Sequence, residues 1–139
     1  MKLNITPQEI INLFESPRLA LDIDDDKWQD ILRVLRFNDM TATLANILSV
    51  NNIALRSHFA LKHLDSSSIY AQRQVQQVRN ESYSLKKLLS NAEVNPIFLK
   101  GAAYILASDE NSHGRLMSDI DILVDKKCLH EVESILKSN

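Results

Sequence analysis

Glycine, proline and cysteine are scarce in this sequence. Its 139 residues include 2 Gly, 3 Pro and a single cysteine, Cys128. So few glycines and prolines disfavour long irregular segments, and a mostly helical chain is expected. One cysteine excludes an intramolecular disulfide and any metal site that is built on several cysteines.

Long apolar runs and a strong excess of one charge are missing as well. No stretch approaches the roughly 18 apolar residues that a membrane span requires, and the N-terminus lacks the apolar run of a signal peptide. The net charge is −2, from 16 basic and 18 acidic residues. This balance gives no general reason to expect binding to nucleic acid or to a membrane. The sequence therefore predicts a cytoplasmic protein in which any recognition of an anionic ligand is local.

Residues 1–94 carry the apolar spacing of helices. Thr6-Pro7-Gln8-Glu9 is a capping box that predicts a helix start. The acidic run at residues 22–26 is interpreted as a helix start rather than a metal site, because carboxylates favour the positive end of the helix dipole. The next helix is marked by Trp28, Ile31, Leu32 and Leu35. A third helix is expected from about Asp39 to Ser49, burying Met40, Leu44, Ile47 and Leu48.

A long helical region is predicted from Ile53 to Ala92, and the sequence leaves open whether residues 65–68 divide it into two helices. A narrow apolar stripe follows residues 71, 75, 78, 82, 85, 89 and 92. Such a stripe can form a coiled coil with a partner or pack within its own chain. Its short length and the serine at position 82 favour packing within the chain.

The segment from Pro96 to Val124 carries the candidate chemistry. Ile97-Phe98-Leu99 is an apolar run typical of a strand that is covered on both faces. Lys100-Gly101 ends this strand, and a helix is expected from Ala102 to Ala107. A glycine at this point lets a backbone or a ligand approach closely.

Two aspartates stand one residue apart at the start of a second predicted strand. Alternate side chains of a strand point to the same face, so Asp119 and Asp121 are expected to project together while Ile120 and Ile122 enter the core. Two adjacent carboxylates suit a hard cation such as Mg²⁺ or Mn²⁺. The alternative is an exposed strand end with two solvated aspartates.

Taken together, LKGAAYIL and the later GRLMSDIDILV resemble the nucleotidyltransferase superfamily. The resemblance is closest to a group of bacterial nucleotidyltransferases in which a helical N-terminal part precedes an LKG…R…DIDLLV core. It is sharp over residues 97–124 and extends to the remainder only in the helix layout.

The resemblance implies an Mg²⁺- or Mn²⁺-dependent enzyme that transfers a nucleotidyl group from a nucleoside triphosphate to an unknown acceptor. It implies that the aspartate pair binds metal and takes part in catalysis. It also implies a nucleotide-binding set of Lys100, Gly101, Ala102, Arg115 and Ser118. Ala102 departs from the superfamily pattern, which has a second small residue, glycine or serine, at this position.

A third carboxylate of the superfamily, on a later strand, has no counterpart before Asn139. Its absence predicts either a fragment of a longer enzyme or a short, incomplete one, and the end on a helix favours a fragment. The alternative function is a non-catalytic, nucleotidyltransferase-like interaction module that acts through its helical region and can associate with itself.

The predicted fold class is α+β. Residues 1–94 would form a helical bundle. Residues 95–139 would form the first part of a small, incomplete nucleotidyltransferase-like sheet with flanking helices.

Overall fold

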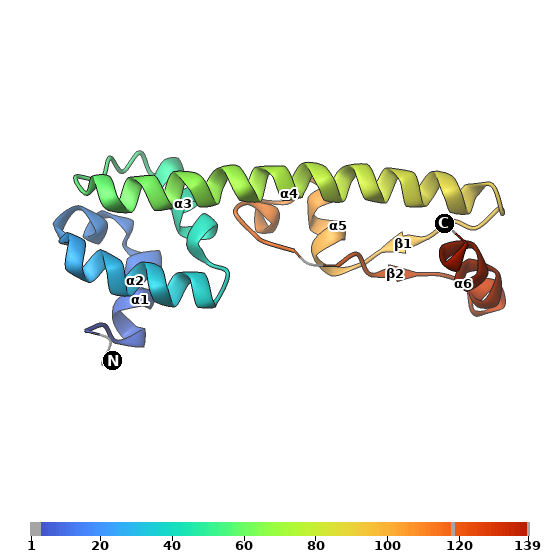
Figure 1. Cartoon of the computed structure of the whole chain (residues 1–139), viewed down its shortest axis with the longest axis horizontal. Coiled ribbons are helices and arrows are strands. Elements are labelled where there is room, and N and C mark those ends of the chain that lie inside the picture. The colour runs from blue at the N-terminus through green and yellow to red at the C-terminus, as the bar shows by residue number, and fades with distance from the viewer. Residues whose placement is uncertain (1–3, 118, 139) are drawn as a thin grey trace. The chain divides into compact units, whose positions relative to one another are not determined.

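The computed structural model describes residues 4–117 and 119–138, and it confirms an α+β fold (Figure 1). Its longer elements are α1 (Pro7–Glu15), α2 (Asp25–Phe37), α3 (Thr41–Val50), α4 (His58–Ser90), β1 (Ile97–Phe98), α5 (Lys100–Leu106), β2 (Ile122–Leu123) and α6 (Leu129–Lys137). Short 3₁₀ helices cover Pro17–Asp22, Glu110–Ser112 and Lys126–Cys128.

Two compact units make up the chain. Unit 1 comprises residues 1–73 and 113–116, and unit 2 comprises residues 74–112 and 117–139. The division falls inside α4, whereas the sequence predicts one at residue 94.

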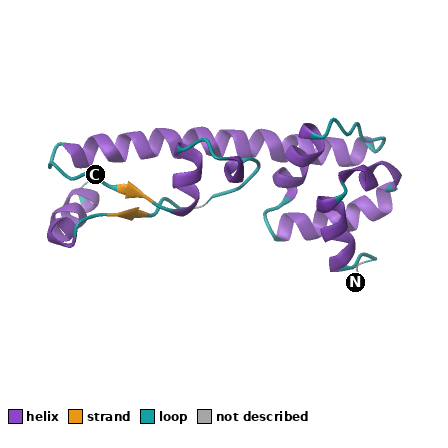
Figure 2. Ribbon diagram, turned by 180° about the vertical axis from the view of Figure 1, so that it is seen from behind, coloured by secondary structure: helices purple, strands orange, loops and turns teal. Residues whose placement is uncertain are grey.

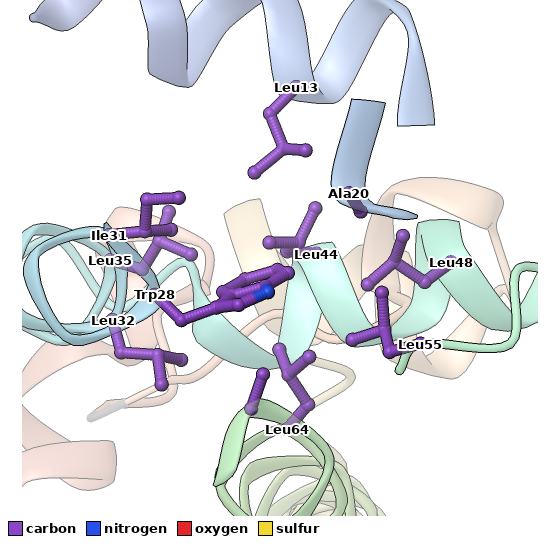
Figure 3. Packing of buried hydrophobic residues seen from close by; sticks show 11 residues of the cluster. Leu13, Ala20, Trp28, Ile31, Leu32, Leu35, Leu44, Leu48, Leu55 and Leu64 are labelled. Atoms are coloured by element: carbon purple, nitrogen blue, oxygen red, sulfur yellow. The ribbon is translucent and has the colours of Figure 1, made fainter. Parts of the chain in front are cut away.

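Unit 1 is built around a continuous apolar core. Trp28 is completely buried and lies in the middle of this cluster (Figure 3). The cluster also contains Leu13, Ala20, Ile31, Leu32, Leu35, Leu44, Leu48, Leu55, Ala60 and Leu64. The predicted face of α2, which includes Trp28, is therefore confirmed, because residues spaced by three and four share one side of a helix.

Two details of the predicted helices in unit 1 are wrong. Met40 is 37% exposed rather than buried, because it precedes α3 as its N-cap residue. The residues from Ile53 to Ser57 are not helical, and α4 begins at His58. The Ser57 hydroxyl accepts a hydrogen bond from the Ala60 N–H at 3.0 Å, so it caps α4 at this point.

The acidic run before α2 has the capping role that the sequence predicts. The Asp24 carboxylate accepts a hydrogen bond from the Lys27 N–H at 2.8 Å. The capping box of α1 is confirmed too, since Thr6 and Glu9 bond reciprocally. Glu9 also accepts a hydrogen bond from the Lys27 ammonium at 2.6 Å. This bond is the largest cause that lowers the pKa of Glu9 to about 2, followed by its hydrogen bonds to Thr6.

We expect Glu9 to make the stability of the chain depend on pH. Its pKa is lower in the folded chain than the ordinary 4.5, so its contribution is complete above about pH 4.5 and is lost as the pH falls towards 2. Replacing Glu9→Gln should therefore lower the free energy of unfolding at neutral pH and have little effect near pH 2. Urea unfolding of both proteins over this range measures the difference, and a difference independent of pH would contradict the assignment.

The serines at positions 66–68 do not divide the long helical region. The hydroxyls of Ser66 and Ser67 donate to the carbonyl oxygens of Lys62 and His63, at 2.7 and 3.0 Å. These bonds follow the i−4 pattern of serine inside a helix rather than that of an N-cap. With no glycine or proline between His58 and Ser90, α4 continues as one helix of 33 residues.

The apolar stripe of α4 is used for packing within unit 2. Val75 and Val78 contact α5 and the segment before β2, and Leu85 and Leu89 pack with α6 and its neighbours. Packing within the chain, which the sequence favours over a coiled coil with a partner, is confirmed for these positions. Ser82 is 2% exposed, and its hydroxyl has no hydrogen-bond partner among the described residues.

The strands of unit 2 form a two-stranded antiparallel sheet (Figure 2). Ile97 pairs with Leu123, and Phe98 pairs with Ile122. Phe98 and Ile122 pack into the core, whereas Ile97 and Leu123 are 60% and 54% exposed. The prediction that the first strand is covered on both faces is therefore wrong, since one face of the sheet has no layer over it in the described residues.

In the part of the chain that the structure describes, four helices end on a left-handed residue that is not glycine. Asp39, Asn52, Glu93 and Ser108 have φ values of 54–58°. In each case the next N–H donates to a carbonyl five residues earlier, at 2.8–3.0 Å, which is the Schellman arrangement. A side chain in this conformation costs about 1 kcal/mol relative to glycine, with asparagine and aspartate tolerated best.

Candidate functional site

The candidate site lies in unit 2, where the start of α5 meets the segment that enters β2. The Leu99 N–H donates to the Asp121 carbonyl at 2.9 Å, so the strand pairing continues one residue beyond the regular sheet. Lys100 is the first residue of α5 and has a φ of 51°. This backbone pairing brings the side chains of Lys100 and Asp121 next to each other.

Lys100 and Asp121 form an ion pair there. The Lys100 ammonium lies 3.0 Å from Asp121 Oδ2, with side-chain exposures of 72% and 35%. The hydrogen bond to Asp121 is the largest cause that raises the pKa of Lys100, followed by the charge of Asp121, and the charge of Asp119 adds to them. Both aspartates are therefore close enough to Lys100 to influence its charge. Because the pair is exposed, its contribution to stability is small.

Gly101 and Ala102 are both buried at the start of α5. A Cβ atom on Gly101 would lie 2.4 Å from the Met117 sulfur. The missing side chain of Gly101 thus makes room for Met117. Ala102 belongs to the apolar cluster with Val78 and Ile105, so any contact of these two residues with a ligand would go through their backbone.

A small pocket of about 160 Å³ lies beside Asp119. Its other lining residues are Gln74, Gln77, Val78, Glu81, Met117 and Ile120. The Gln74 side-chain oxygen accepts the Met117 N–H at 3.0 Å, and the Gln77 amide donates to Glu81 at 2.7 Å. The pocket therefore combines the carboxylate of Asp119, from the segment before β2, with the carboxylate of Glu81, from α4.

The sequence predictions overlooked this contribution of α4. Gln74, Gln77 and Glu81 flank the apolar stripe, and the sequence shows only that they are polar. These three residues are spaced by three and four positions, which places them on one side of the helix next to Val78. The packing of a helix determines which of its polar sides borders a site. The spacing of the apolar residues alone does not specify this packing.

Arg115 and Ser118 complete the predicted nucleotide-binding set. Arg115 belongs to the segment His113–Leu116 of unit 1. Ser118 lies outside the described residues. Asp125, the next aspartate of this segment, accepts the Lys127 N–H at 3.0 Å and caps the 3₁₀ helix that precedes α6.

The donor set fits a hard divalent cation. Aspartate oxygens are preferred ligands of Mg²⁺ and Mn²⁺, and the Lys100 ammonium shows that a positive charge is accommodated beside Asp121. Within residues 4–117 and 119–138, no three side chains of His, Cys, Asp or Glu are grouped closely enough to hold a metal ion. Water and phosphate oxygens would therefore have to complete the coordination.

Comparison with known protein families gives a match over most of the chain. A family described as an uncharacterised nucleotidyltransferase matches residues 24–139. The chain belongs to this family. The match includes the whole of α2 to α6, so the nucleotidyltransferase resemblance of the LKG and DID segments extends to the preceding helices. Comparisons with curated proteins and with solved structures found no match.

Membership supports a general nucleotidyltransferase role, and a nucleotide is the substrate that such a role implies. No helix among the described residues of this nucleotidyltransferase is long and apolar enough to cross a membrane.

Proposed function

We propose that unit 2 binds a nucleoside triphosphate together with Mg²⁺ or Mn²⁺ and transfers its nucleotidyl group to a hydroxyl acceptor. The observation that carries the proposal is the ion pair of Lys100 with Asp121, next to Asp119. It brings two acidic groups and one basic group together where the strand pairing ends. The cation requires negatively charged ligands and the triphosphate requires a positively charged donor, so binding both requires acidic and basic groups.

In the proposed complex Asp119 and Asp121 hold the divalent cation. The cation, when bound, compensates the negative charge of the triphosphate and of the leaving pyrophosphate. With a cation held by the two aspartates, Lys100 would be free to leave Asp121 and to donate to a phosphate oxygen. Lys100 is 72% exposed, so its ammonium can move to a ligand at little cost in packing.

In the reaction, the oxygen of the acceptor hydroxyl forms a bond to the α-phosphorus while the bond between this phosphorus and the pyrophosphate oxygen breaks. Pyrophosphate leaves with the electron pair of the broken bond, and the hydroxyl proton passes to water. Glu81 borders the pocket beside Asp119 and accepts a hydrogen bond from Gln77 at 2.7 Å. A carboxylate at this position can accept a hydrogen bond from the acceptor hydroxyl. We therefore propose that Glu81 orients the acceptor. The nucleotide-binding roles that the resemblance implies for Arg115 and Ser118 stay predictions.

The proposal is tested by calorimetric titration of ATP, GTP, CTP and UTP, each with Mg²⁺ and with EDTA. We expect at least one nucleotide to bind only with the cation. The double substitution Asp119→Asn with Asp121→Asn should weaken this binding at least about tenfold, which corresponds to 1.4 kcal/mol.

Asp125→Asn is the matched control, because it changes an aspartate of the same segment and asparagine caps helices equally well. It should leave nucleotide binding unchanged. Equal binding in EDTA, or equal losses in the control and the double variant, would contradict the proposal.

A further inference from the structure

A second polar depression lies in unit 1, at the start of α3. Its volume is about 270 Å³, near the lower limit of ordinary ligand pockets. Arg36, Asp39, Thr41, His63, Tyr70 and Leu116 border it. All of them belong to unit 1, so this depression is distinct from the pocket beside Asp119.

Arg36 provides a positive charge that no carboxylate pairs with in the part of the chain that the structure describes. One of its guanidinium nitrogens lies 2.8 Å from His63 Nδ1. A guanidinium has only donors, so Nδ1 accepts and the imidazole is neutral in this arrangement. Burial, and then the charges of Arg36 and Lys62, lower the pKa of His63, which agrees with a neutral ring. Four further N–H donors of Arg36 are left for a ligand.

The start of α3 adds donors to the same depression. The N-cap residue, Met40, has no side-chain oxygen and forms no capping bond, so the first N–H groups of this 10-residue helix are not capped by a side chain. Thr41 is the first helical residue and is only 5% exposed. Its hydroxyl has no hydrogen-bond partner among residues 4–117 and 119–138. A buried hydroxyl without a partner is unfavourable, so a ligand that accepts its hydrogen bond would recover the lost energy.

The loop from His113 to Leu116 covers one side of this helix start. A Cβ atom on Gly114, whose φ is 69°, would lie 2.4 Å from the Ala42 carbonyl oxygen. The Thr43 hydroxyl donates to the Gly114 carbonyl at 3.1 Å. These contacts hold the loop against α3 and place Leu116 at the border of the depression.

We infer that this depression binds a phosphate group, with Arg36, the Thr41 hydroxyl and the first N–H groups of α3 as its donors. The hydroxyls of Ser66 and Ser67 donate to helix carbonyls and contribute no proton. Asp39 also borders the depression, and its negative charge weakens anion binding. The inference does not depend on the proposed transfer reaction, because it involves no residue of unit 2.

The test titrates the whole chain with inorganic phosphate in the absence of divalent cations, followed by calorimetry or phosphorus NMR. Saturable binding is expected with a dissociation constant on the order of 1 mM, which corresponds to about 4 kcal/mol. Arg36→Gln should weaken it at least about tenfold, or 1.4 kcal/mol. Arg33→Gln is the control, since Arg33 lies one turn earlier on α2 and pairs with Asp30 at 3.4 Å.

Two further variants separate binding from folding. Thr41→Val keeps the shape of the side chain and removes the hydroxyl, so it should weaken phosphate binding several-fold without lowering stability. Asp39→Asn should strengthen binding, because it removes a negative charge and asparagine tolerates a positive φ. The double substitution Asp119→Asn with Asp121→Asn in unit 2 should have no effect on phosphate binding.

Phenyl phosphate distinguishes a free oxyanion from a phosphate monoester. Tighter binding than inorganic phosphate would indicate a monoester whose organic part contacts Leu116 and the Tyr70 ring, and equal binding would indicate the free ion. Either result supports the site. Absence of saturable binding for both probes up to roughly tenfold above 1 mM, or equal losses in Arg36→Gln and Arg33→Gln, would overturn it.

Discussion

Replacing Trp28→Ala is expected to lower the free energy of unfolding by about 3–5 kcal/mol. Trp28 is completely buried and touches the core that α1 to α4 share in unit 1. Removing its ring leaves a cavity that the surrounding leucines can fill only in part. Small domains are stable by only about 5–15 kcal/mol, so this loss is a large fraction of the total.

Trp28→Phe is the informative control. The indole N–H is buried and has no hydrogen-bond partner among the described residues. Phenylalanine removes this unsatisfied donor and keeps most of the packing, so the expected loss is about 1–2 kcal/mol. Urea unfolding followed by circular dichroism measures both variants, and equal losses would show that the ring volume does not determine the stability of unit 1.

Gly114→Ala is expected to destabilise the chain by about 2–4 kcal/mol. Two costs add: a left-handed conformation for a residue with a side chain, and a Cβ atom placed 2.4 Å from the Ala42 carbonyl oxygen. Because the clash is with backbone, α3 or the loop has to move. Trp28 is the sole tryptophan, so its fluorescence during urea unfolding reports unit 1 directly.

Gly101→Ala provides the comparison for Gly114→Ala. Its Cβ atom would also meet a neighbour at 2.4 Å, but that neighbour is the flexible side chain of Met117, which can rotate away. Alanine also favours the interior of a helix over glycine by about 1 kcal/mol. A loss as large as that of Gly114→Ala would contradict the distinction between backbone and side-chain contacts.

The core of unit 1 is well predicted from the sequence, because helical spacing and helix capping depend only on residues that are close in the chain. Trp28, Ile31 and Leu35 follow the helical period, and the capping residues Thr6 and Asp24 act through bonds to the next few residues. Met40 shows the limit of this reasoning. It continues the apolar pattern of the following helix, but the chain turns at Asp39 and leaves Met40 37% exposed.

The candidate site is predictable only in part. The LKG and DID segments predict a glycine turn near two aspartates, and the pairing of Leu99 with Asp121 brings these segments together. The involvement of Gln74, Gln77 and Glu81 depends on which side of α4 packs beside Asp119, and that choice is made by the tertiary fold. The same holds for the depression at Arg36 and Thr41, whose residues come from separate segments of the sequence.

The helix end at Glu93 has a practical consequence for work on this protein. Glycine at this position would relieve the left-handed backbone without touching the aspartates, the ion pair or the phosphate depression. A gain of about 1 kcal/mol would raise the melting temperature by several degrees. A more heat-resistant version for crystallisation or long titrations is therefore within reach of one surface substitution, whereas glycine at Ser108 would also remove the hydrogen bond that its hydroxyl accepts from Arg79 at 3.1 Å.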